Sequence, residues 1–282
     1  MPIHIVTGQF AENMMRHLSV RIALSAIAAF MVLASSPLVA HSADAALTAM
    51  PKDLEVRFAL SALPPKLRPA AAVYVLDPAI GYRLARPGTS GLACLVERTA
   101  WELGTDRDDI YIPLCYDASG LPGHFKAIID AAALRAHGMS ALGIKAEISK
   151  RYEQHYYHTP MRAGLSYMEA PIMRTKSKPD FEIIRDHGPT DWEVHTMAMP
   201  HIMIYASGVT NADIGAVPDL AHPESLSQPF IDTQGNGEQS YIIQVVGATE
   251  KKKILEDEKD LVKDLCDYRE VLCLEHDNHN MN

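Results

Sequence analysis

Two histidines and three methionines alternate along one short segment, and their types and spacing suit metal chemistry better than any other group in this sequence. The segment is residues 195–205, HTMAMPHIMIY. Side chains of a strand point alternately to its two faces, so a single strand here would place five potential ligands on one face: His195, Met197, Met199, His201 and Met203. Imidazole nitrogen and thioether sulfur are ligands that Cu(I) accepts. The pattern predicts a periplasmic copper-handling protein, with Met197, Met199 and Met203 as metal ligands.

The same alternation is typical of a strand that packs an apolar face into the protein. Alternate residues of a strand lie about 6.5–7 Å apart, so neighbouring ligands must converge to share one ion. Methionine is also an ordinary filler of irregular cores. Pro200 has no backbone N–H for a ladder hydrogen bond, which predicts an edge strand or a bulge. We favour packing over copper for this segment.

Proton transfer is a further possibility in the same region, where four side chains suit it: Glu193, His195, His201 and Asp213. Because histidine exchanges protons near neutral pH, a hydrolase-like enzyme with His195 or His201 as general base is one hypothesis. Asp213 lies in TNADIG, residues 210–215, and we favour a turn-forming role for it. The sequence has no GxSxG, HExxH or strand-associated GxGxxG motif that would name a reaction.

Binding of a small ligand in the region 161–213 is the function we favour from the sequence. Of the 13 methionines, nine lie in residues 46–282, and six of those nine lie between Met161 and Met203. Methionine-rich surfaces adapt to ligands, and no catalytic motif accompanies them. The sequence leaves open whether the protein is an enzyme, and it gives neither the ligand nor the oligomeric state.

The N-terminal residues predict export. Arg16 and Arg21 precede an apolar run over residues 22–40. Ala43-Asp44-Ala45 then supplies the small residues of a cleavage site. We expect residues 1–45 to be a cleaved signal peptide, with a retained anchor as the alternative and the periplasm or the cell exterior as destination. Residues 1–13 do not resemble the start of a signal, so the true start can be Met14 or Met15. No later segment is apolar for long enough to span a membrane.

The charge balance argues against a nucleic-acid partner. The formal net charge is −9, and phosphate contacts need clustered lysine and arginine. The only basic run, residues 251–253, is followed by acidic residues. The composition, with 22% charged and 48% hydrophobic residues, is that of an ordinary globular protein.

The hydrophobic periodicity predicts a single α+β domain over residues 46–282, with an antiparallel sheet, helices packed on one side and a C-terminal amphipathic helix over 251–275. Residues 54–116 are expected to be β structure. A meander of four strands is expected within them, over 71–78, 81–88, 91–98 and 109–116. Two helices follow, one ended by Gly138 and one beginning at 141 with Ser140 as N-cap. Extended segments are expected at 162–175, 195–205 and 239–247, with loops between them.

The four cysteines are expected to form one disulfide and one pair of free thiols. Folding the third and fourth strands of the meander together brings Cys94 opposite Cys115, which favours a disulfide. Cys266 and Cys273 would lie about 10 Å apart along a continuous helix, which is too far for a bridge. We expect this second pair to be free thiols unless the helix breaks between them.

Overall fold

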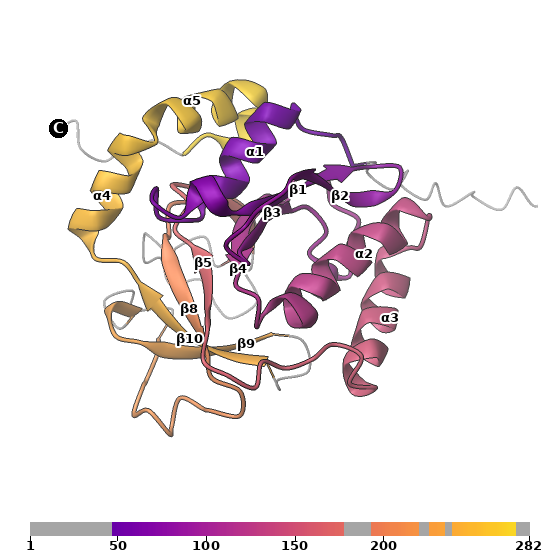
Figure 1. The fold of residues 1–282 in the computed structure, drawn as a ribbon, viewed down its shortest axis with the longest axis vertical. Helices are drawn as coiled ribbons and strands as arrows, with labels where there is room; N and C mark the ends of the chain where they lie inside the picture. Colours follow the sequence, from indigo (N-terminus) through magenta and orange to yellow (C-terminus); the bar gives the residue numbers. More distant parts are fainter. Residues whose placement is uncertain (1–46, 178–192, 220–225, 235–238, 275–282) are drawn as a thin grey trace, which may run out of the picture. The chain divides into compact units, whose positions relative to one another are not determined.

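Eight strands of the computed structural model form one sheet, in the order β2-β1-β3-β4-β5-β8-β10-β9 (Figure 1). The structure describes residues 47–177, 193–219, 226–234 and 239–274, so the predicted signal segment lies outside the described residues. The strands are β1 (Ala72–Asp77), β2 (Gly81–Arg86), β3 (Ala93–Glu97), β4 (Ile112–Tyr116), β5 (Leu165–Met168), β8 (His201–Tyr205), β9 (Phe230–Gln234) and β10 (Gln239–Val245). A separate two-stranded sheet pairs β6 (Met173–Ser177) with β7 (Glu193–Met197).

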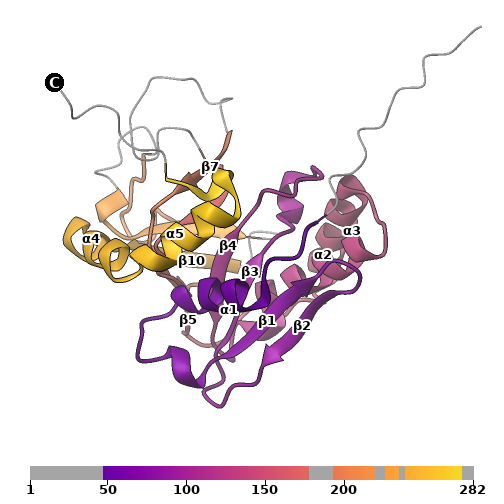
Figure 2. The same ribbon diagram turned by 90° about the horizontal axis from the view of Figure 1, so that it is seen from above.

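Five α-helices accompany the sheets among the described residues, which confirms the α+β class. They are α1 (Lys52–Ser61), α2 (Lys126–Ala136), α3 (Ala141–Glu153), α4 (Ala248–Asp257) and α5 (Lys259–Tyr268). Figure 2 shows α2 and α3 side by side next to β1 and β2, with α5 next to α1. None of the described helices is long and apolar enough to cross a membrane.

The helices cover both faces of the sheet around β3. Cys94 and Val96 pack into a core with α1 and α5, whereas Leu95 packs into a second core with Ile128 of α2. Successive residues of a strand point to opposite faces, so helices packed on one side only were a wrong prediction. Every residue of β3 is buried, which is typical of a central strand covered on both faces.

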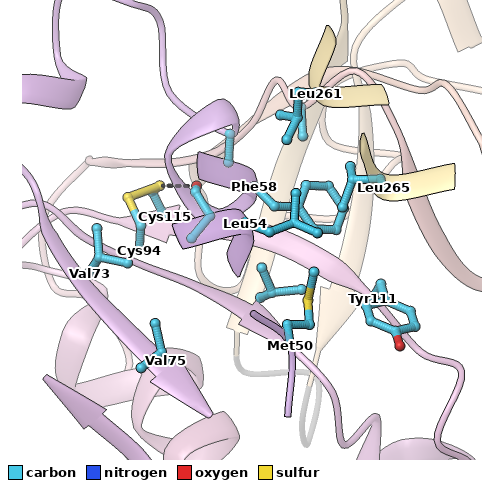
Figure 3. Close-up of a cluster of buried hydrophobic side chains, with 14 of the residues drawn as sticks. Met50, Leu54, Phe58, Val73, Val75, Cys94, Tyr111, Cys115, Leu261 and Leu265 are labelled. Carbon is cyan, nitrogen blue, oxygen red and sulfur yellow. Dashed lines mark hydrogen bonds between the residues drawn. A yellow bond between two sulfur atoms is a disulfide. The ribbon is translucent and has the colours of Figure 1, made fainter. Parts of the chain in front are cut away.

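The first predicted β segment begins with a helix instead. Leu54, Phe58 and Ala62 are buried and recur every four residues, which is the helical period, so α1 presents them together to the core. In Figure 3 the side chains of Leu54 and Phe58 lie next to Leu261 and Leu265 of α5. This contact between distant parts of the chain stabilises α1 as a helix.

The four predicted strands form, but they do not make a meander. β3 pairs with β1 in parallel, through Ala72 with Ala93 and Val73 with Cys94, so the chain passes back over β1 after leaving β2. β2 becomes the edge strand, where Arg83 and Leu84 are exposed. The difference in burial between β2 and β3 explains the order, because the strand whose residues are all buried belongs in the interior.

The structure confirms α2 and α3, including the boundaries that their capping residues predicted. Gly138 has φ +80°, a left-handed conformation that favours glycine after a helix end. The Ser140 hydroxyl oxygen accepts a hydrogen bond from the Gly143 backbone N–H at 3.3 Å, as an N-cap does. The loop predicted over 211–232 was wrong at its end, because residues 230–234 form β9 along the outer side of β10.

The C-terminal helix predicted over 251–275 is two helices that meet at Glu258. α5 ends at Tyr268 because Arg269 has extended backbone angles, and a short 3-10 turn then brings the chain back. Cys266 and Cys273 therefore lie with their Cα atoms 4.5 Å apart and form a disulfide. Free thiols were a wrong prediction. The Cys94–Cys115 disulfide is confirmed, with the two residues directly opposite each other in β3 and β4.

Candidate functional site

The histidine–methionine segment, residues 195–205, is not one strand. Its first part belongs to β7 in the two-stranded sheet, and its second part, from His201, belongs to β8 in the large sheet. Residues 198–200 connect them without strand structure, and Pro200 is buried there. Because proline offers no N–H to a neighbouring strand, the ladder is interrupted at this point. The prediction of five ligands on one face of a single strand was therefore wrong.

Several side chains of this segment are packed in the interior. Met197 and Met203 are 2% exposed and His201 is 4% exposed. The His201 Nδ1–H donates a hydrogen bond to the Met199 carbonyl oxygen at 2.8 Å. Burial lowers the pKa of His201, which favours the neutral ring. His195 and Met199 are half-buried. His201 is thus a paired core histidine rather than a residue at a surface.

The two acidic candidates lie elsewhere. Asp213 is exposed in a turn, where its carboxylate accepts hydrogen bonds from the Thr210 hydroxyl at 2.7 Å and the Thr210 backbone N–H at 2.8 Å. These hydrogen bonds lower the pKa of Asp213, as expected for a turn-forming carboxylate. Glu193 begins β7, and its side chain lies outside the described part. Within the described ranges, no three histidine, cysteine, aspartate or glutamate side chains group to hold a metal ion.

A different segment gathers buried polar side chains that the sequence analysis did not single out. We call residues 97–102, ERTAWE, the β3 exit, because they lead from the end of β3 into a short 3-10 helix at 101–103. Glu97, Thr99 and Trp101 are 4%, 6% and 4% exposed. Within the described structure, Glu97 Oε1, Thr99 Oγ1 and Trp101 Nε1 have no hydrogen-bond partner. Such atoms are uncommon in native proteins and call for an explanation.

Arg98 fixes the backbone of the β3 exit from inside the protein. Its side chain is fully buried, and the guanidinium group donates to the carbonyl oxygens of Thr48, Asp108 and Ile110 at 2.8–3.3 Å. The same group lies 3.9 Å from the ring centroid of Tyr111, a cation–π contact. The β3 exit is thereby held on a rigid support.

Thr99 and Trp101 line a pocket, which we call the Trp101 pocket. Its empty volume is about 210 Å³, including space open to solvent. The space in this pocket that a water molecule can enter has room for roughly one. Ala100, Ala141 and Ile144 give it an apolar wall, and it is also lined by Gly104, Thr105, Asp106 and Arg135.

Helix α3 and the turn after the β3 exit shape this pocket. Gly104 has φ +60° and ends the 3-10 helix in a left-handed conformation. Lys145 of α3 donates from Nζ to the Glu102 carbonyl oxygen at 2.8 Å. The Trp101 ring stacks on Tyr152 of α3, with ring centroids 5.7 Å apart. These contacts place the first turn of α3 against the pocket.

A second group next to the pocket can exchange protons. His124 is buried, its Nδ1 is 2.9 Å from the Tyr152 hydroxyl, and its Nε2 is 3.9 Å from Glu102 Oε1. Burial lowers the pKa of His124 to about 4, so the ring is neutral. The pKa of Glu102 is raised to about 7, mainly because surrounding protein displaces water, although 42% of its side chain stays accessible. Burial, and then the charge of Glu102, raise the pKa of Glu97 well above its ordinary value.

Comparison of this chain with protein-family models, with curated proteins and with solved structures finds no match.

Proposed function

We propose that this is an exported protein that binds a small polar ligand, and that the ligand occupies the Trp101 pocket. The observation that carries this proposal is a pair of polar groups, Thr99 Oγ1 and Trp101 Nε1, that have no hydrogen-bond partner among the described residues and belong to residues that line the pocket. A buried polar group without a partner costs about 1–3 kcal/mol. Both atoms are almost inaccessible to solvent, so a ligand recovers that cost only if the pocket wall opens far enough for it to bond to them. The proposal moves the ligand from the region 161–213 to the β3 exit.

Export is supported by the cysteines as well as by the signal-like sequence. All four cysteines are in disulfides, and disulfides persist in oxidising compartments such as the periplasm. N-terminal sequencing of the protein recovered from the periplasm should give a chain that begins near Ala46. A full-length chain in the membrane fraction would show a retained anchor instead.

A second candidate function is acid–base catalysis beside the pocket. It rests on the 3.9 Å approach of His124 Nε2 to Glu102 Oε1 and on the pKa of Glu102, about 7. A carboxyl group with that pKa can act as general acid or base at neutral pH. Glu102 would then replace His195 or His201 in the catalytic role. Copper binding by Met197, Met199 and Met203 stays a prediction that no observation favours.

The two tryptophans of the chain, Trp101 and Trp192, make the ligand proposal measurable. In a Trp192→Phe variant, the fluorescence reports Trp101 alone. We expect one or more of a set of small polar solutes to shift this emission and to raise the melting temperature, because ligands that bind the folded state stabilise it.

Filling the pocket provides the decisive variant. Ala141→Leu adds bulk to the buried wall residue Ala141 and should abolish the response, whereas Ala146→Leu, at an exposed position of the same helix, should preserve it. If Ala141→Leu unfolds the protein by overpacking the pocket, Thr99→Val tests the polar contact in its place. The proposal is wrong if no solute changes the emission, or if Ala141→Leu and Thr99→Val respond as the parent does.

A further inference from the structure

We propose that the Cys266–Cys273 disulfide is a redox-sensitive switch, whose reduction by a dithiol loosens the two-stranded sheet of β6 and β7 while the rest of the fold stays intact. This inference does not depend on the Trp101 pocket. Three features carry it. The disulfide is the more accessible of the two, it closes a turn with little regular structure, and that turn is hydrogen-bonded to both strands of the small sheet.

The two disulfides differ in how accessible they are to a reductant. Cys94 and Cys115 are 0% exposed and join two central strands, β3 and β4. Cys266 and Cys273 are partly exposed and join the end of α5 to the turn after it. A thiolate must reach one of the sulfur atoms to break a disulfide, so access decides which bridge reacts first. A dithiol should therefore reduce Cys266–Cys273 in the folded protein and leave Cys94–Cys115 intact.

The Cys266–Cys273 disulfide closes a short reversal of the chain. The backbone of Arg269 is extended, and residues 270–272 form a 3-10 turn that brings the chain back beside α5. A short 3-10 segment has poorer hydrogen-bond geometry than an α-helix and adds little stability of its own. A disulfide restricts the open conformations of the loop that it closes. Loss of the covalent link should therefore make this turn open more often.

The turn is hydrogen-bonded to both strands of the small sheet through one carbonyl oxygen. The Val271 carbonyl oxygen accepts from the Thr196 hydroxyl of β7 and from Arg174 Nη1 of β6, the latter at 3.3 Å. Arg174 and Thr196 are direct partners in the register of β6 and β7. Side chains of direct partners lie on the same face of a sheet. Opening of the turn therefore removes both hydrogen bonds from this face together.

Other contacts of the turn confine the change to this part of the protein. Leu272 is 0% exposed in a core that includes α1. Arg269 Nη1 donates to the Asp108 carbonyl oxygen and to the Tyr111 hydroxyl, each at 2.9 Å. These contacts remain after reduction, so the turn should open more frequently without leaving the protein. Helices α2 and α3 take no part in them, and we expect these helices to stay as they are.

The reaction is a thiol–disulfide exchange. One thiolate of the dithiol attacks a sulfur atom of the Cys266–Cys273 bridge, the S–S bond breaks, and the other cysteine leaves as a thiolate that takes up a proton. The second thiol of the dithiol loses its proton and attacks the mixed disulfide, which releases the remaining cysteine as a thiol. The protein gains two electrons and two protons, and the dithiol becomes a disulfide.

Graded reduction tests the selectivity. The folded protein is treated with dithiothreitol, a small dithiol, the free thiols are alkylated, and peptide mass spectrometry locates them. Cys266 and Cys273 should be labelled at least about tenfold faster than Cys94 and Cys115. In denaturant, where access is equal, the two pairs should be labelled at similar rates.

Hydrogen exchange with the reductant present tests the effect on the small sheet. Peptides that cover β6 and β7 should exchange at least about tenfold faster after reduction, whereas peptides that cover α2 and α3 should exchange as before. A Cys266→Ser, Cys273→Ser double variant should show the same pattern without reductant. Thr196→Val removes one hydrogen bond to Val271, so it should raise the exchange of β7 in the oxidised protein and diminish the further effect of the dithiol.

Three results would overturn the proposal. The first is equal reactivity of the two disulfides in the folded protein. The second is reduction of Cys266–Cys273 with no change in the exchange of β6 and β7. The third is an equal rise in the exchange of α2 and α3, because the disulfide would then support the whole fold. If the double variant does not fold, reduction of the unmodified protein gives the same readouts. None of these results bears on the ligand proposal for the Trp101 pocket.

Discussion

His201 and Trp101 are equally buried, at 4% exposed, but their ring N–H groups have opposite surroundings. The Nδ1–H of His201 donates to the Met199 carbonyl oxygen, whereas the Nε1–H of Trp101 has no acceptor within the described residues. His201 thus satisfies its ring donor within the histidine–methionine segment, whereas Trp101 of the β3 exit finds no acceptor among the described residues. The comparison teaches that an unpaired donor, rather than a reactive residue type, marks the better candidate site.

The largest effect on this comparison is expected from replacing Arg98, whose side chain holds the backbone of the β3 exit. Arg98→Leu removes three hydrogen bonds of the guanidinium group. It leaves the carbonyl oxygen of the buried residue Ile110 without this donor, whereas the Asp108 carbonyl oxygen keeps the donor from Arg269. At about 1–3 kcal/mol for a buried unpaired group, we expect a loss of about 1–3 kcal/mol in the free energy of unfolding. Urea denaturation measures it. Arg83→Leu, at an exposed position of the edge strand β2, should change it by less than about 0.5 kcal/mol. Equal effects of the two variants would mean that Arg98 does not hold the segment.

The contributions of Glu97 and His201 to the free energy of unfolding should change with pH in opposite directions. Burial raises the pKa of Glu97 and lowers that of His201. A raised folded-state pKa means that stability is fully present below the unfolded pKa of the carboxyl group and is lost as pH rises through the folded value. A lowered folded-state pKa means that stability is present above the unfolded pKa of histidine and is lost as pH falls through the folded value.

Neutral variants at these two positions test the opposition. Glu97→Gln should be more stable than the parent at alkaline pH, with the advantage shrinking as pH falls. His201→Gln should be less sensitive to acid than the parent. Unfolding free energies measured between pH 4 and pH 9 give both trends. The account is contradicted if the two variants shift the pH profile in the same direction.

The smallest effect compares two threonines that differ in pairing. Thr99 Oγ1 has no partner within the described structure, whereas Thr196 Oγ1 in β7 donates to the Val271 carbonyl oxygen. Thr99→Val should leave stability unchanged or raise it by up to about 1 kcal/mol, since it removes an unpaired group. Thr196→Val should lower it by about 1 kcal/mol. Thermal denaturation of the ligand-free protein distinguishes them, and a larger loss for Thr99→Val would show that its hydroxyl is paired.

Local signals predicted much of the fold. Period and capping located α2 and α3, and Ser140 caps as expected. The strand pattern put Cys94 opposite Cys115. Long-range choices were missed, because no local pattern shows that β3 returns beside β1 or that α5 stops at Tyr268. The first depends on which strand is covered on both faces, and the second on contacts between distant segments.

The candidate site could not be predicted in the same way. Thr99 and Trp101 are unremarkable residue types, and whether a donor is paired depends on neighbours supplied by α3, about 40 residues later in the chain. One sequence signal was present: an apolar strand that ends in Glu97-Arg98-Thr99 and then meets Gly104. By contrast, the histidines and methionines attracted attention by type, and Pro200 already indicated that their strand is interrupted.

The indole N–H of Trp101 offers the most direct measurement. In Trp192→Phe protein labelled with ¹⁵N, a proton–nitrogen correlation spectrum contains a single indole resonance. A small polar solute that raises the melting temperature of this variant should also move the resonance saturably toward the frequency of a hydrogen-bonded indole. An indole resonance that stays in place while such a solute is added to saturation would contradict a ligand site built on this donor.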